Sequence, residues 1–181
     1  MKPALKAIWN AVTSILVVLV VLLAVALVGV RLVGYQPFAV LSGSMEPQFS
    51  TGDLIYVKDV DYRTLKEGDV ITFLLSENTV ATHRIVEVVP DENDPSVIRY
   101  RTKGDANDAV DGSLVHYMNV IGSPAEFSLP LLGYVASYIS APPGMYVAMG
   151  LGALLILLVF LPDILSKEEK EQGRYERVDE R

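Results

Sequence analysis

Apolar residues are concentrated near both ends of the chain. The 24 residues from Ala7 to Val30 carry no charge, and Ile15 to Val30 holds nothing but aliphatic residues, Ala and Gly. A second uncharged stretch, Gly144 to Pro162, has 19 residues and as a helix would reach about 28 Å, close to the roughly 30 Å of a bilayer's hydrocarbon core. Both stretches predict membrane-spanning helices, because lipid forces a backbone to satisfy its own hydrogen bonds.

Each stretch has an alternative interpretation. A basic start with Lys2 and Lys6, followed by Ala24-Val25-Ala26, is typical of a cleavable secretory signal. The apolar run is longer than the usual run of about 7–15 residues and continues past that Ala-Val-Ala, so we favour an uncleaved anchor. The alternative for the second stretch is a buried core helix. We disfavour it because the rest of the chain is too small to bury a helix that is apolar all round.

The distribution of Lys and Arg predicts the orientation of both spans. Two lie in the first six residues and five follow Asp163, whereas the 20 residues after the first span hold only Arg31 and the 20 before the second hold none. Since positively charged flanks stay in the cytoplasm, we expect a two-pass protein of the cell membrane with both ends cytoplasmic. The expected parts are a short cytoplasmic N-terminus (1–6), an N-terminal anchor (7–33), an extracytoplasmic domain (34–143), a C-terminal transmembrane helix (144–162) and a charged cytoplasmic tail (163–181).

The middle segment predicts short strands rather than long helices. Turn-forming residues separate apolar or alternating runs at 53–58, 70–75, 81–89 and 97–102. Several short strands at this spacing indicate an antiparallel β-domain, partly closed or coiled. The uncharged stretch 127–139 predicts either a last strand or a segment lying on the membrane surface. The predicted fold class is therefore mainly β, with a transmembrane helix on each side.

Composition narrows the chemistry. With 51% hydrophobic and 20% charged residues, the chain is too apolar for an ordinary soluble domain. The absence of cysteine excludes disulfides, thiolate catalysis and cysteine-bound zinc, and two histidines leave little material for a histidine metal site. A formal charge of −7 argues against a protein that binds nucleic acid.

Three segments of the middle region hold reactive side chains. The heptad LSGSMEP (41–47) places Ser44 beside a glycine, where the backbone can approach a substrate closely; a surface turn is the alternative. His83 lies within a predicted strand and is suited to moving protons near neutrality, or else it is a half-buried structural residue. Asp105, Asp108 and Asp111 fall within seven positions, which suits an Asx-rich turn, a cation-binding loop or a carboxylate that orients an imidazole. The second histidine, at position 116, is interpreted as structural.

A serine, a histidine and an aspartate in one domain are the parts of an acyl-transfer triad. From about Phe38 to Tyr134 the sequence also resembles type I signal peptidase of the archaeal and endoplasmic-reticulum type. The blocks that carry the resemblance are, in order, SGSMEP (42–47), GDLIYV (52–57), GDVI (68–71), HRIV (83–86) and KGD (103–105) followed by Asp111.

The resemblance implies the signal-peptidase fold, a coiled antiparallel β-domain. It implies a membrane-bound serine endopeptidase that removes N-terminal signal peptides from exported preproteins by cutting after small residues, as in Ala-X-Ala. Ser44 matches the family's nucleophile, and His83 matches the base that replaces the lysine of most bacterial relatives. Asp111 matches the acid of the triad and Asp105 a supporting carboxylate. Ser42 would donate to the oxyanion together with the Ser44 backbone N–H.

No metal or organic cofactor is expected. The expected partners are preproteins that carry signal peptides, membrane lipid and the protein translocation channel, and no nucleic acid. Two alternatives stay open. One is a Ser–Lys dyad that uses Lys103, and the other is a membrane-anchored β-domain that binds a partner without activity, in which Asp105, Asp108 and Asp111 hold a cation.

Overall fold

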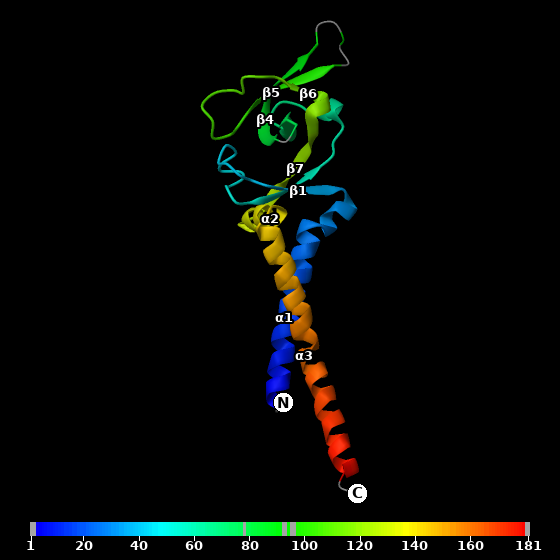
Figure 1. The fold of residues 1–181 in the computed structure, drawn as a ribbon. Coiled ribbons are helices and arrows are strands. Elements are labelled where there is room, and N and C mark those ends of the chain that lie inside the picture. The colour runs from blue at the N-terminus through cyan, green and yellow to red at the C-terminus, as the bar shows by residue number, and fades with distance from the viewer. Residues whose placement is uncertain (1–2, 78, 92–93, 95–96, 180–181) are drawn as a thin grey trace. The chain divides into compact units, whose positions relative to one another are not determined.

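The structure, a computed structural model, describes residues 3–77, 79–91, 94 and 97–179 (Figure 1). The chain divides into two compact units. The helical unit comprises Met1–Val25 and Tyr138–Arg181, and the β unit comprises Ala26–Ser137.

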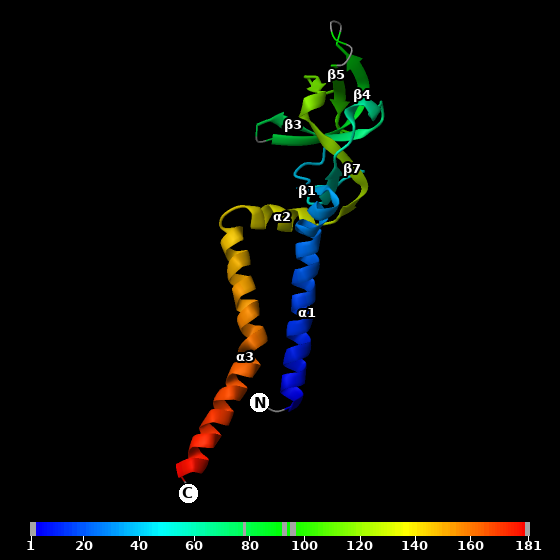
Figure 2. The ribbon, with the colours of Figure 1, turned by 90° about the vertical axis from the view of Figure 1, so that its right-hand side faces the viewer.

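The helical unit is built from α1 (Pro3–Leu27) and α3 (Gly144–Asp179). Ala4–Leu27 and Gly144–Pro162 are long and apolar enough to cross a membrane, and only 6% of either window is buried inside the protein. Such exposure suits helices whose apolar side chains face lipid. In Figure 2 the two helices converge towards the N-terminal end of α1, where the Trp9 indole N–H donates to the Leu158 carbonyl at 3.0 Å.

Both helices differ in length from the uncharged runs that predicted them. The helix α1 ends at Leu27, before the run ends at Val30, and a 3-10 helix, η1 (Gly29–Val33), follows it. The backbone of α3 continues past Pro162 to Asp179. The charged tail is therefore helical over most of its length, because its many Glu, Lys and Arg residues favour helix as well as solvent.

The described part of the β unit forms one seven-stranded sheet. Neighbouring strands are antiparallel, in the order β1-β2-β7-β3-β4-β5-β6. The strands are β1 (Tyr35–Ala39), β2 (Leu54–Lys58), β3 (Val70–Ser76), β4 (Thr79–Pro90), β5 (Ile98–Lys103), β6 (Val115–His116) and β7 (Val120–Leu129). The expectation of a mainly β, antiparallel fold between two apolar helices is confirmed, and the four predicted strands correspond to β2 through β5.

The β unit has two separate cores, and β3 contributes to both. Val70 packs into one, whereas Ile71 and Phe73 pack into the other, since successive side chains of a strand point to opposite faces. The first core contains Met45, Phe49, Ile55, Val57 and Val70, and the second contains Ile71, Phe73, Ile85, Tyr100 and Val115. A strand covered on both faces is typically rich in apolar residues at successive positions, and residues 70–75 are apolar except for Thr72.

Three strands and one helix were not predicted, and one of the strands, β6, is only two residues long. Proline interrupts the two longer ones. Pro37 lies in β1, at the edge of the sheet, and Pro124 lies beside a register shift in β7, both positions where a strand tolerates the missing N–H. The stretch 127–139 divides between the end of β7 and the helix α2 (Leu132–Ser140). The break falls at Leu131, whose φ of 63° is left-handed.

Candidate active site

The segment that carries Ser44 is anchored in the first core. It joins β1 to β2 and makes a turn in which the Phe49 N–H donates to the Met45 carbonyl at 3.1 Å. Met45 and Phe49 are only 2% and 1% exposed, so their burial in the first core holds the turn in place. Ser42 lies exposed at the surface, and Ser44 is partly buried.

Strand β4 sets the position of His83. His83 stands opposite Ile71 on β3 and points to the same face as Ile85, which is fully buried in the second core. The Phe73 ring meets the imidazole edge-on, with 6.2 Å between ring centroids. Only 14% of the His83 side chain is exposed. With apolar groups around the ring, its two nitrogens provide its polar contacts.

Ser44, His83 and Asp111 form a chain of hydrogen bonds. His83 Nδ1 lies 2.6 Å from Asp111 Oδ2, and His83 Nε2 lies 3.3 Å from Ser44 Oγ. An ionised carboxylate only accepts, so Nδ1 carries the hydrogen and Nε2 is left to accept the serine proton. The longer distance, to Ser44, is at the outer end of the hydrogen-bonding range, as is common before substrate binds. This arrangement suits transfer of a proton from a hydroxyl to an imidazole.

Ser42 adds a second hydroxyl beside the first. Its Oγ lies 3.4 Å from Ser44 Oγ, and either oxygen can donate. A hydroxyl at this distance from a nucleophile is within reach of the oxygen of a carbonyl under attack.

The three aspartates of the 103–112 segment have different partners. Asp111 binds His83, whereas Asp105 binds Arg84, the next residue on β4, through Nε at 2.8 Å and Nη2 at 2.6 Å. These hydrogen bonds, chiefly, raise the pKa of the Arg84 guanidinium above its usual value. Asp108 is exposed, and within the described residues no bond joins it to His83 or Ser44.

Arg84 also links the segments on either side of the site. Its Nη1 donates to the Gly68 carbonyl at 2.6 Å, and its Nη2 donates to Gln48 Oε1 at 2.5 Å. Gln48 lies in the turn that carries Ser44, and Asp105 lies in the loop that carries Asp111. One guanidinium therefore holds both loops against β4.

The two loops also touch directly. The Ala106 N–H donates to the Ser44 carbonyl at 2.9 Å, and a Cβ added at Gly104 would lie 2.6 Å from that same carbonyl oxygen. Position 104, which lies against the Ser44 backbone, therefore requires glycine.

Sequence reasoning missed Thr102, Gln48 and the role of Arg84. Thr102 Oγ1 donates to Asp111 Oδ2 at 2.6 Å, and no local pattern in the sequence signals a contact between a strand residue and a loop nine positions away. Lys103, the alternative base, follows Thr102 on β5 and pairs with Arg84 across the strands. His116 caps η3 (Tyr117–Asn119) by accepting from the Met118 N–H at 3.2 Å.

Among the described residues no group of three or more His, Asp or Glu side chains is arranged to hold a metal ion.

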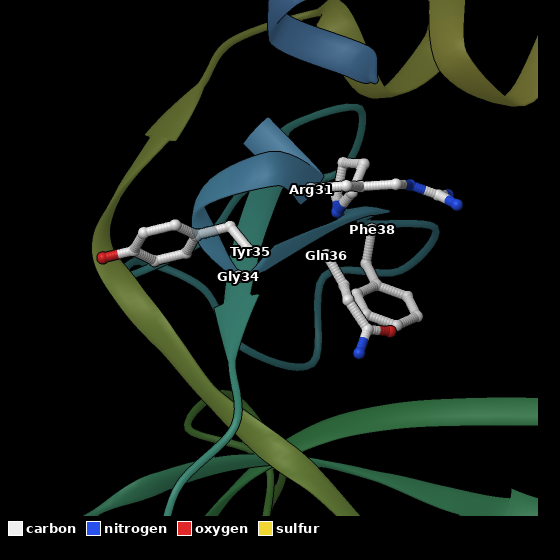
Figure 3. Close-up of a pocket in the computed structure, with 6 residues that line it drawn as sticks. Arg31, Gly34, Tyr35, Gln36 and Phe38 are labelled. Atoms are coloured by element: carbon white, nitrogen blue, oxygen red, sulfur yellow. The ribbon is translucent and has the colours of Figure 1, made fainter. Parts of the chain in front are cut away.

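A shallow hollow of about 440 Å³ lies elsewhere in the β unit, lined by η1 and β1 residues that include Arg31, Gln36 and Phe38 (Figure 3). The Tyr35 ring points away from Arg31 in this view, and none of the predicted site residues lines the hollow.

Comparison with known proteins shows the family to which the chain belongs. Residues 11–95 match the family described as signal peptidase, peptidase S26. Signal peptidase I W of Bacillus subtilis (strain 168) is 39% identical over 134 residues, which cover 70% of this chain and 69% of that protein. The signal peptidase complex catalytic subunit SEC11C of Homo sapiens is 30% identical over 128 residues, or 65% of each protein. The catalytic subunit SEC11 of Eremothecium gossypii is 35% identical over 129 residues, which cover 66% of this chain and 75% of that protein.

The chain is therefore a peptidase, a hydrolase of peptide bonds. It belongs to the signal peptidase family, peptidase S26, whose members remove signal peptides from the preproteins that carry them. Its two apolar helices accord with an enzyme of membranes.

Proposed function

We propose that this chain is a serine endopeptidase of the cell membrane that removes N-terminal signal peptides from exported preproteins by acyl transfer through Ser44, His83 and Asp111. The observation that carries the proposal is the chain of hydrogen bonds from Ser44 Oγ through the His83 ring to Asp111 Oδ2, at 3.3 and 2.6 Å. A serine hydroxyl is a poor nucleophile unless an adjacent base takes its proton, and this chain supplies that base.

In the proposed reaction, Ser44 Oγ attacks the carbonyl carbon before the scissile bond while His83 Nε2 takes the hydroxyl proton. Asp111 stabilises the imidazolium and keeps its Nδ1–H oriented. His83 returns the proton to the leaving amine, so the peptide bond breaks and an ester to Ser44 remains. Water, activated by the same imidazole, then hydrolyses the ester and releases the signal peptide.

The negative oxygen of the tetrahedral intermediate needs donors. We assign the Ser42 hydroxyl and the Ser44 backbone N–H to this role. The 3.4 Å distance between the two serine oxygens supports the assignment of Ser42.

An extended substrate suits the sheet edge beside the nucleophile. Strand β1 lies at one edge of the sheet and is followed within a few residues by Ser42 and Ser44. A substrate strand added to β1 would direct alternate side chains toward the enzyme, and shallow apolar pockets there would admit Ala and exclude larger groups. This would give cleavage after Ala-X-Ala.

Membrane attachment would bring enzyme and substrate together. The β unit is joined in sequence to an apolar helix at each end, and we propose that both termini are cytoplasmic and that the β unit lies outside. A signal peptide held in the same bilayer would then search a surface rather than a volume, which raises its effective concentration. Membrane lipid and the translocation channel are the proposed surroundings of the reaction.

The test is cleavage of an Ala-X-Ala preprotein by the full chain in membranes. Single substitutions Ser44→Ala, His83→Ala and Asp111→Ala should each lower kcat by about 1000-fold or more, because each removes a part of one catalytic unit. Circular dichroism checks that each variant is folded. Undiminished cleavage by folded Ser44→Ala would overturn the proposal, because another group would then be the nucleophile. Absence of cleavage by the folded parent would favour a domain that binds a partner without activity.

Matched substitutions separate the alternatives. His116→Ala removes the other histidine, whose contact lies at η3, and should leave cleavage within about twofold of the parent. Lys103→Ala should also cleave, whereas a loss with Lys103→Ala and activity with His83→Ala would establish a Ser–Lys dyad instead. A chelator should not change the rate, because no step of the proposed reaction uses a divalent cation.

A further inference from the structure

Thr102 holds Asp111 at two points. Its backbone carbonyl accepts from the Asp111 N–H at 2.8 Å, and its hydroxyl donates to Asp111 Oδ2 at 2.6 Å. The Thr102 side chain is completely buried, near the end of β5. Two bonds from one strand residue therefore fix both the main chain and the side chain of the carboxylate.

The hydroxyl and the imidazole meet the same oxygen. Asp111 Oδ2 accepts from Thr102 Oγ1 and from His83 Nδ1, each at 2.6 Å. The terminal torsion of an aspartate is broad and roughly two-fold, so one hydrogen bond alone leaves the carboxylate free to rock or to exchange its oxygens. A second donor on Oδ2 fixes which oxygen faces His83.

A threonine is well suited to this task. Its β-branched side chain has a restricted χ1 torsion in a strand, so the hydroxyl is already directed before the bond forms. Because the Thr102 hydroxyl is buried, water does not compete with Asp111 for its proton. Hydrogen bonds to charged groups are also stronger than those between neutral groups.

We infer that Thr102 is a positioning residue of the reaction, which acts on His83 and Ser44 through Asp111 by holding the carboxylate in the orientation that directs the imidazole. This inference rests on the proposed function. Among the hydrogen bonds of the described residues, none joins Thr102 to Ser44 or to His83, so its effect must pass through Asp111.

Two substitutions of Thr102 distinguish the effect of its hydroxyl from the effect of its methyl group. Thr102→Val keeps the shape and removes the donor, and we expect kcat for preprotein cleavage to fall by about tenfold with KM within about twofold of the parent. Thr102→Ser keeps the donor and should retain kcat within about threefold, although it loses a buried methyl group. A Thr102→Ser variant as slow as Thr102→Val, or a Thr102→Val variant as fast as the parent, would overturn the inference.

Thr72→Val is the matched control. Thr72 is also a fully buried strand threonine, but its hydroxyl bonds to the Thr82 hydroxyl at 2.8 Å instead of to the carboxylate. It should lower the thermal midpoint much as Thr102→Val does while leaving kcat within about twofold of the parent. An equal loss of kcat in both valine variants would mean that buried hydroxyls matter only for stability, and would refute the inference.

A double substitution tests the route. In an Asp111→Ala background, adding Thr102→Val should cause no further loss of the residual rate, because the residue through which Thr102 acts is gone. A further tenfold loss would show that Thr102 acts elsewhere.

A spectroscopic measurement separates this inference from the proposed function. The full chain contains two histidines, so ¹⁵N-labelled imidazole signals can be assigned with His116→Gln. Thr102→Val should shift the His83 ring signals and Thr72→Val should not, whether or not the protein cleaves a preprotein. If Ser44→Ala cleaves normally but the His83 signals shift, the acyl-transfer proposal fails and the positioning contact stands. Unshifted His83 signals in Thr102→Val would overturn the contact itself.

Discussion

The Arg84 guanidinium grips the Asp105 carboxylate with two parallel hydrogen bonds, Nε to Oδ1 at 2.8 Å and Nη2 to Oδ2 at 2.6 Å. His83, its neighbour on β4, binds Asp111 on the opposite face of the strand. Two adjacent strand residues therefore each hold one carboxylate of the same loop. The loop is fixed at two positions six residues apart, and this pairing determines which aspartate can serve the imidazole.

Arg84→Lys should lower both the activity and the stability, although Arg84 makes no hydrogen bond to Ser44, His83 or Asp111 among the described residues. A lysine cannot make two parallel hydrogen bonds to Asp105 or reach Gln48 and Gly68 at the same time. We therefore expect the free energy of unfolding to fall by about 1–2 kcal/mol and kcat/KM to fall by about tenfold. Thermal unfolding and preprotein cleavage measure the two effects. Activity equal to the parent would show that the Ser44 and Asp111 segments hold their places without the guanidinium.

Gly104→Ala should displace Ser44. The new Cβ would lie 2.6 Å from the Ser44 carbonyl oxygen, which is backbone and cannot rotate away, so one of the two loops must move. We expect a loss of cleavage of at least about 100-fold, since small misplacements at a reacting atom are costly. Gly112→Ala is the control: nothing lies within 4 Å of its added Cβ, and it should cleave like the parent. Equal activity of both variants would contradict this account of the loop contact.

Tyr100 should make stability depend on pH in the alkaline range. Burial, aided by Tyr62 and Asp61, raises the pKa of Tyr100 to about 12 from 10.0. The folded protein keeps the phenol proton to higher pH than the unfolded chain does, so this contribution to stability is complete below pH 10 and disappears as the pH rises from 10 to 12.

Chemical denaturation of the detergent-solubilised chain at a series of pH values measures this decline. Tyr100→Phe should lose about 1 kcal/mol at pH 8, because the hydrogen bond from the Tyr100 hydroxyl to the Tyr62 carbonyl is gone. It should also decline less steeply than the parent between pH 10 and 12. Parallel curves for the two proteins over that interval would mean that another group is responsible.

The proposed orientation can be tested because the chain has no cysteine. Met118, in the β unit, is 73% exposed, so Met118→Cys should react with a membrane-impermeant maleimide on intact cells. Glu176→Cys, in the charged tail, should react only after the cells are opened. The reverse pattern would place the β unit in the cytoplasm and exclude its action on exported preproteins.

The sequence predicted those strands that the local pattern of apolar and turn-forming residues is enough to identify. The runs that became β2 through β5 are apolar or alternating between turn residues, and their pattern follows from burial on one or both faces. The strands β1 and β7 escaped prediction because Pro37 and Pro124 are tolerated only through tertiary context, an edge in one case and a register shift in the other.

The sequence predicted the candidate site as a set of residues, whereas the contacts between them came only from the structure. Sequence motifs singled out Ser44, His83 and the aspartates, yet three carboxylates within seven positions offered no means of choosing between them. The distinction between Asp105 and Asp111 depends on the register of β4 and β5, which pairs Ile85 with Thr102 and Arg84 with Lys103. Register is a relation between strands, and no single segment encodes it.

The division of the β unit into two cores has a consequence for the safety of the cell. Ser44 rides on the turn anchored by Met45 in one core, whereas His83 belongs to the strand that buries Ile85 in the other. In the proposed reaction Ser44 and His83 act together, so a chain with only one core folded would hold one of them in place but not both. Peptidase activity would then require both cores, so that a nascent or damaged copy with only one of them folded would be harmless to its neighbours.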